Sequence, residues 1–174
     1  MNKIFIILFL LFLNFTLIDD QSYAEDGKIK IGLLVPLSGD NAYLGKQIIK
    51  ATRLALKDIN SDKIEIYPKD TMSDPNSTLR SALELKQLGI NLIIGPVFYE
   101  NLQYLDEINE VTFLSFTNKT LNLPKNVIST GINSASQLNT IKKFIKLNEI
   151  KKPIFLIPNL NYNLEVKHGI KKSK

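Results

Sequence analysis

Residues 29–45 read IKIGLLVPLSGDNAYLG, a stretch that begins as a strand and ends in a polar turn. Its first apolar residues alternate with Lys30 and Gly32 and then run without interruption from Leu33 to Val35, which is typical of a strand that becomes fully buried. Pro36 and the polar residues behind it end the strand. The stretch therefore predicts a buried strand with a loop at its carboxyl end.

An amphipathic helix is predicted over about residues 43–59. Apolar positions recur there at intervals of three and four residues, while lysine and arginine occupy the other side. We expect the apolar stripe to be the packed face. It consists of Leu44, Ile48, Ala51, Ala55 and Ile59.

Strands and helices continue to alternate along the chain. The second strand should stop at Pro68, and Asp74 should cap the next helix, with Pro75 at its first position. Ser134 or Ser136 is the expected cap of the last predicted helix. The further strands are expected over 63–67, 92–94, 112–116, 127–130 and 153–157, and the further helices over 75–88, 100–109 and 134–145. Parallel neighbours need crossovers, so this order predicts an α/β fold: a doubly wound parallel sheet with helices on both faces.

The amino-terminal residues have the order of a signal peptide. Lys3 precedes an apolar stretch, and Ser-Tyr-Ala at residues 22–24 predicts cleavage before Glu25. An uncleaved anchor is the alternative, and both outcomes imply export, which we expect to be periplasmic with no membrane span after cleavage. The expected divisions are a signal peptide at 1–24, a first α/β lobe at 25–133, and the start of a second lobe plus a basic tail without apolar period at 134–174.

Composition argues against several functions. The 174 residues contain no cysteine, hence no disulfide, thiolate nucleophile, cysteine-based zinc site or lipid-attachment cysteine. The formal net charge of +5 reflects lysines on a solvated helix face and its exit and in the tail, and the arginines are only Arg53 and Arg80, so nucleic acid is not an expected partner. The sole histidine, His168, lies near the end of the chain, where no catalytic triad is plausible. We expect neither an enzyme nor a cofactor.

Ligands of open parallel sheets bind beyond the carboxyl ends of the strands. The loops expected there, at 37–43, 69–74, 96–99 and 115–120, carry hydroxyl, amide, carboxylate and aromatic groups, which suits a pocket that orients a small molecule. Turn formation and helix capping are the alternative for residues 38–41 and 117–118. The candidate ligand contacts are Ser38, Asn41, Tyr43, Asp70, Val97, Phe98, Tyr99, Ser115, Thr117 and Asn118.

The chain resembles the leucine-type periplasmic binding proteins, both in the amino-acid sequence of several short segments and in their order along the chain. These segments are 31–39, 55–60, 92–96 and 113–118, together with Leu44-Gly45. The resemblance covers about residues 28–163. It implies binding of an amino acid or similar small polar ligand, delivered to or sensed for an ABC-type membrane transporter. It also implies that Tyr162 is the second-lobe tyrosine that faces the ligand, although Asn163 replaces the glycine that usually follows.

Within that superfamily, segments 35–39, 94–98 and 114–118 most resemble the penicillin-binding protein activators. That branch implies the alternative function, regulation of cell-wall synthesis through contact with a cell-wall synthase. Amino-acid receptors of the family place serine or threonine after the third strand to hold the ligand carboxylate, whereas this chain has Val97, Phe98 and Tyr99.

The length of the chain is the largest departure from the family pattern. Family members continue through the rest of a second lobe, and this sequence ends at Lys174. Since hinge closure of two lobes traps the ligand, half of the cleft would be missing. A truncated gene product is expected, and a short one-lobe protein that pairs with a partner or with itself is the alternative.

Overall fold

The computed structural model describes residues 27–157, 159 and 162–173. Five parallel strands form one sheet in the order β2-β1-β3-β4-β5. They are β1 (Ile29–Val35), β2 (Ile64–Asp70), β3 (Leu92–Ile94), β4 (Thr112–Ser115) and β5 (Val127–Ser129). The predicted α/β fold with a parallel sheet is confirmed. The predicted signal peptide lies outside the described residues.

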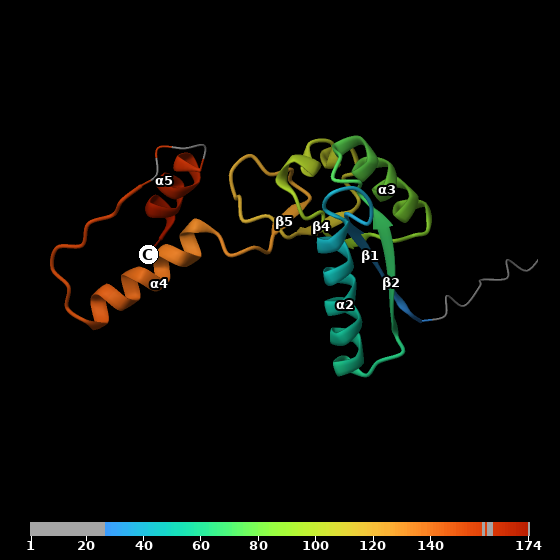
Figure 1. The fold of residues 1–174 in the computed structure, drawn as a ribbon, viewed down its shortest axis with the longest axis horizontal. Coiled ribbons are helices and arrows are strands. Elements are labelled where there is room, and N and C mark those ends of the chain that lie inside the picture. Colours follow the sequence, from blue (N-terminus) through green and yellow to red (C-terminus); the bar gives the residue numbers. More distant parts are fainter. Residues whose placement is uncertain (1–26, 158, 160–161, 174) are drawn as a thin grey trace, which may run out of the picture.

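In the described part of the chain, four α-helices and two short 3-10 helices accompany the sheet (Figure 1). They are α2 (Ala42–Ile59), α3 (Pro75–Gln87), η1 (Tyr99–Leu102), η2 (Leu105–Glu107), α4 (Ser134–Leu147) and α5 (Asn163–Lys172). Figure 1 shows α4 and α5 side by side and away from the sheet. Within the described part of the chain, no helix is long and apolar enough to cross a membrane.

Capping and turn residues in the sequence predicted most helices and strands correctly, as the start of α3 illustrates. The Ser77 N–H donates to the Asp74 carboxylate at 2.7 Å, and Pro75 occupies the first turn, as expected. The cap of α4 is different, because Asn133, and not Ser134 or Ser136, accepts the hydrogen bond, from the Ser136 N–H at 3.0 Å.

The helix expected over 100–109 is wrong, because this segment forms η1 and η2 instead. Leu102, Leu105 and Ile108 are all buried and lie three residues apart. A spacing of three fits the 3-10 helix, which has three residues per turn, as well as it fits one face of an α-helix.

The second strand continues through Pro68, where the sequence predicted its end. Among the strands that the structure describes, β2 lies at the edge with β1 as its one neighbour, and an edge tolerates a residue that lacks an N–H donor. The strand expected over 153–157 does not form, since no described strand lies beside it and its side chains are exposed. The basic tail, in which the sequence showed no periodic spacing of apolar residues, is mostly helical. It belongs to α5, and this helix packs on α4.

The main core lies between the sheet and α3. Leu34, Ile93 and Phe113 of the sheet are fully buried there, together with Ala82 and Leu85 of α3. The two 3-10 helices extend the same layer through Leu102, Leu105 and Ile108.

The expected packed stripe of α2 is wrong, because most of it is exposed. The half-buried Ile49, Thr52 and Leu56 line the space beside Leu33 of the sheet instead. Gly45 explains this rotation: a Cβ atom there would lie 1.7 Å from the Pro36 carbonyl oxygen, so the glycine allows the helix to touch the end of β1. The contact between Gly45 and Pro36 is a tertiary contact, which the spacing of apolar residues along the helix could not predict.

Candidate functional site

The carboxyl ends of four strands bring the predicted loops to one edge of the sheet. Val35 of β1 pairs with Asp70 of β2, and Ile94 of β3 pairs with Leu33 and Leu114 on its two sides. The loops that follow these strands therefore leave the sheet at similar heights. We call this region the carboxyl edge.

Asp70 joins the first two of these loops. Its Oδ1 accepts hydrogen bonds from the N–H groups of Leu37 at 2.7 Å and Met72 at 2.8 Å. Burial alone would raise the pKa of this carboxyl group. The Ser38 hydroxyl and the N–H groups of Leu37, Met72 and Ser38 outweigh burial and hold the pKa below its ordinary value of 3.8. The carboxylate thus holds the loops in place, although the sequence suggested it as a ligand contact.

Replacement of Asp70 by asparagine is expected to lower the free energy of unfolding by about 2 kcal/mol at pH 7, because the N–H groups of Leu37 and Met72 lose a charged acceptor. Since the pKa of Asp70 is lower in the folded state, its contribution is present above the unfolded value of 3.8 and is lost as the pH falls through the folded value. Urea denaturation from pH 7 to pH 2 should show the two proteins converging. The exposed Asp106→Asn is the matched control, and a constant difference across that range would contradict the assignment.

Ser115 and Thr117 are also engaged within the protein. The buried Ser115 hydroxyl donates to the Pro96 carbonyl at 2.9 Å and accepts from the Thr117 N–H at 3.2 Å. The Thr117 hydroxyl accepts from the Lys119 N–H at 3.2 Å. The bond from Ser115 to Pro96 connects the ends of β3 and β4, and the bonds at Thr117 fix the turn after β4, so both hydroxyls hold the carboxyl edge in shape.

Other predicted residues remain open to solvent at this edge. Ser38, Asn41, Tyr43 and Asn118 are exposed, and Tyr43 retains 74% of its accessible surface. The backbone N–H groups of Val97 and Phe98 make no hydrogen bond with any described residue. Unpaired N–H groups in a loop attract anionic groups such as carboxylates.

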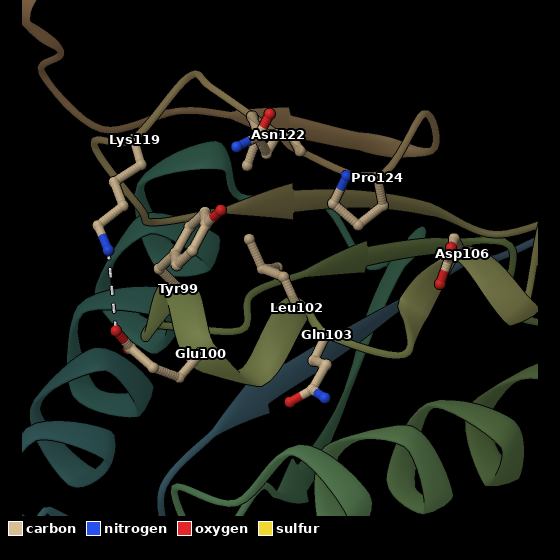
Figure 2. A pocket seen from close by; sticks show the side chains of 9 residues that line it. Tyr99, Glu100, Leu102, Gln103, Asp106, Lys119, Asn122 and Pro124 are labelled. Carbon is tan, nitrogen blue, oxygen red and sulfur yellow. Dashed lines mark ion pairs between the residues drawn. The ribbon is translucent and has the colours of Figure 1, made fainter. Parts of the chain in front are cut away.

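Tyr99 does not lie with the other candidate residues but lines a separate pocket of about 560 Å³ between η1 and the β4–β5 loop, which we call the lateral pocket. The Lys119 ammonium lies 4.0 Å from the centroid of the Tyr99 ring and 3.8 Å from Glu100 Oε1. Figure 2 shows this ion pair at one end of the pocket and Asp106 at the other, with Leu102 between them. No sequence motif indicated this pocket, because its walls come from segments about 20 residues apart.

Tyr162 lies at the start of α5, beside an acidic anchor that sequence reasoning missed. The anchor is Glu165, which is only 4% exposed. Its carboxylate accepts hydrogen bonds from the Thr120 N–H and hydroxyl and from the Leu121 N–H, at 2.9–3.1 Å. We call this arrangement the Glu165 clasp. The Tyr162 hydroxyl has no hydrogen-bond partner among the described residues. Burial raises its pKa most, and the nearby charge of Glu165 raises it further.

The parallel sheet, its strand order and its carboxyl-edge loops invite comparison with known proteins. The family model for periplasmic binding proteins matches residues 28–173. This chain belongs to that family. The match includes all five strands and every helix that the structure describes, so the resemblance inferred from short segments extends over nearly all of the described residues.

Three relatives illustrate the range of similarity. A Leu/Ile/Val-binding protein homologue of Brucella abortus is 33% identical over 73 residues, which are 38% of this chain and 20% of that protein. The C-domain of LpoA from Haemophilus influenzae, described as a regulator of PBP1A, superposes with a TM-score of 0.66 at 23% identity, covering 80% of this chain and 44% of that one. A solute-binding protein of an ABC transporter from Rhodopseudomonas palustris, in complex with 3,4-dihydroxybenzoic acid, gives a TM-score of 0.60 at 25% identity, covering 84% and 44%.

Length separates this chain from these proteins. The matches span only a fifth to a quarter of the curated relatives, and less than half of the solved structures just named. The neighbours include both a solute-binding protein of an ABC transporter and a protein described as a regulator of PBP1A, so the shared fold alone does not select between the two functions.

Proposed function

We propose that this chain is an extracytoplasmic solute-binding domain of the leucine type, which binds an amino acid or a similar small polar ligand for an ABC-type transport system. The observation that carries this proposal is the pair of N–H groups at Val97 and Phe98, in the loop that follows β3, which have no partner among the described residues. They lie at the carboxyl edge, where open parallel sheets bind ligands, and they can hold a ligand carboxylate without a charged side chain.

Exposed side chains supply the rest of the proposed contact surface. Tyr43 offers an aromatic ring, and Ser38 and Asn118 offer a hydroxyl and an amide. Together with the N–H groups, they form a polar surface that orients a ligand and performs no chemistry on it. Export by the predicted signal peptide is part of this proposal, because solute capture for a transporter takes place outside the cytoplasm.

Thermal unfolding of the exported chain in the presence of amino acids, short peptides and organic acids tests this function. A ligand at 100 times its Kd should raise the Tm by roughly 5–10 °C. Tyr43→Ala should weaken binding about tenfold, which corresponds to about 1.4 kcal/mol of lost contact. Its stability should change by less than about 0.5 kcal/mol, because the side chain is exposed. Leu54→Ala, an exposed position about three turns along α2 from Tyr43 and so away from the carboxyl edge, is the control. A folded protein whose Tm responds to no ligand would count against solute binding.

Regulation of cell-wall synthesis by protein contact is the second candidate. The observation that favours it is the replacement of the expected small hydroxyl residues after β3 by the half-buried Phe98 and Tyr99. Aromatic side chains are enriched at protein interfaces. Capture of the periplasmic portion of a cell-wall synthase, combined with an absence of any ligand-induced Tm shift, would favour this function over solute binding.

A further inference from the structure

The Glu165 clasp holds a carboxylate in the way that a binding site holds a ligand. Oε1 of Glu165 accepts hydrogen bonds from the Thr120 N–H at 3.0 Å and the Leu121 N–H at 2.9 Å, and Oε2 accepts from the Thr120 hydroxyl at 2.9 Å. Successive backbone N–H groups that converge on one point form a site for anions. The β4–β5 loop therefore presents three donors to a single carboxylate, and we call them the loop donors.

No cation of the described residues neutralises this carboxylate. Glu165 is only 4% exposed, and it takes part in none of the ion pairs that the described residues form. A buried carboxylate is stable only where hydrogen bonds replace those that it made with water, and the loop donors supply these bonds. Recognition therefore rests on backbone N–H groups and one hydroxyl, which offer the same bonds to the carboxylate of a separate molecule.

The two partners of the clasp belong to different parts of the chain. On one side, α4 and α5 pack together, and the Ser134 hydroxyl of α4 donates to the Glu165 carbonyl at 2.7 Å, which fixes the backbone that carries the carboxylate. On the other side, the Tyr99 hydroxyl donates to the Leu121 carbonyl at 3.4 Å, next to the loop donors. The sheet with its loops thus acts as the receptor, and the α4–α5 pair supplies the bound group.

The loop donors are distinct from the N–H groups to which we assigned solute binding. Thr120 and Leu121 follow β4, whereas Val97 and Phe98 follow β3. The N–H groups of Val97 and Phe98 have no partner among the described residues, but those of Thr120 and Leu121 are occupied by Glu165. The loop after β4 therefore offers a second set of carboxylate donors, and the chain itself fills it.

We propose that the loop donors are a binding site for a small free carboxylate, and that Glu165 is a built-in competitor that occupies this site when no such ligand is present. A competitor within the same chain has a high effective concentration, about millimolar or more, so a ligand displaces it only at a higher concentration or with additional contacts. Displacement frees α5 from the β4–β5 loop. The clasp is thus an autoinhibitory contact that opens when the carboxylate ligand binds.

Formate, the smallest carboxylate, tests the site in the full chain. Glu165→Ala removes the competitor and leaves the loop donors vacant. In this variant the NMR signals of the Thr120 and Leu121 amides should shift saturably with formate, with a Kd about tenfold or more below that of the wild type, because no internal competitor remains. Chloride at the same ionic strength, and formamide, which lacks the charge, should leave both signals in place. The exposed Glu107→Ala on η2 is the matched control and should respond as the wild type does.

Thermal unfolding provides the second measurement. Formate at about ten times its Kd should raise the Tm of Glu165→Ala by roughly 3–6 °C more than that of the wild type. Adding Thr120→Ala removes the hydroxyl donor, and the Kd for formate should then rise about tenfold, since a hydrogen bond to a charged acceptor is lost. Glu165→Gln keeps the bulk of the side chain, so it should fold. Its neutral amide competes less well than a carboxylate, and formate should bind this variant about threefold more tightly than the wild type.

Signals of Thr120 and Leu121 that do not respond to formate in either Glu165 variant, or that respond equally in the wild type, overturn the proposal. These outcomes are separable from the proposed function. Formate bound after β3 would shift the Val97 and Phe98 amides to the same extent in variant and wild type, and the thermal screen measures solute binding there separately.

Discussion

Replacement of Glu165 by alanine is expected to lower the free energy of unfolding by about 3 kcal/mol and to loosen the β4–β5 loop. Three donors, the N–H and hydroxyl of Thr120 and the N–H of Leu121, would lose their acceptor. Each buried donor without a partner costs about 1–3 kcal/mol, and water entering the space left by the side chain offsets part of that sum. Hydrogen exchange should accelerate at the Thr120 and Leu121 amides, which report the clasp directly.

Two variants refine this test. Glu165→Gln retains the size of the side chain but places an amide NH2 among donors, so it should recover only part of the loss. Glu107→Ala removes an exposed carboxylate from η2 and should change stability by less than about 0.5 kcal/mol. Unaltered exchange at Thr120 and Leu121 in Glu165→Ala would show that the clasp does not hold the loop.

Gly95→Ala should be at least as damaging, with an expected loss of about 4 kcal/mol or more. Gly95 has a φ of +105°, a conformation that residues with a Cβ atom rarely adopt. An added Cβ would also lie 2.2 Å from the Leu34 carbonyl oxygen, so β1 and β3 would have to separate. Urea denaturation followed by circular dichroism measures the effect.

Gly89→Ala separates the two causes, because Gly89 also has a positive φ, +77°, but no atom lies within 4 Å of its added Cβ. Its expected cost is about 1 kcal/mol, from conformation alone. Equal losses in the two variants would mean that close packing at Gly95 contributes nothing.

The parts of the fold that depend on residues close together in the sequence were predictable from the sequence. The apolar run to Val35 identified β1, and Asp74 with Pro75 identified the start of α3. Elements whose form depends on distant contacts were not. The rotation of α2 follows from Gly45 against Pro36, and the 3-10 geometry of η1 and η2 follows a spacing of three that also fits an α-helix.

The candidate site also has a part that the sequence predicted and a part that it did not. Parallel topology correctly indicated that the loops after β1 to β4 share one edge. The sequence could not show that the Ser115 hydroxyl is occupied by the Pro96 carbonyl, or that Tyr99 belongs to the lateral pocket. The Glu165 clasp joins residues 45 positions apart, and no local pattern reports such a pairing.

Pro68 in the middle of β2 has a consequence for how molecules of this protein can meet. An outer strand with an uninterrupted row of donors invites the strand of another molecule, and repetition of that event produces fibres. β2 lacks one donor at Pro68, and the opposite outer strand, β5, has only three residues. Both borders of the sheet are therefore poor templates for further strands, which protects the protein against amyloid-like growth.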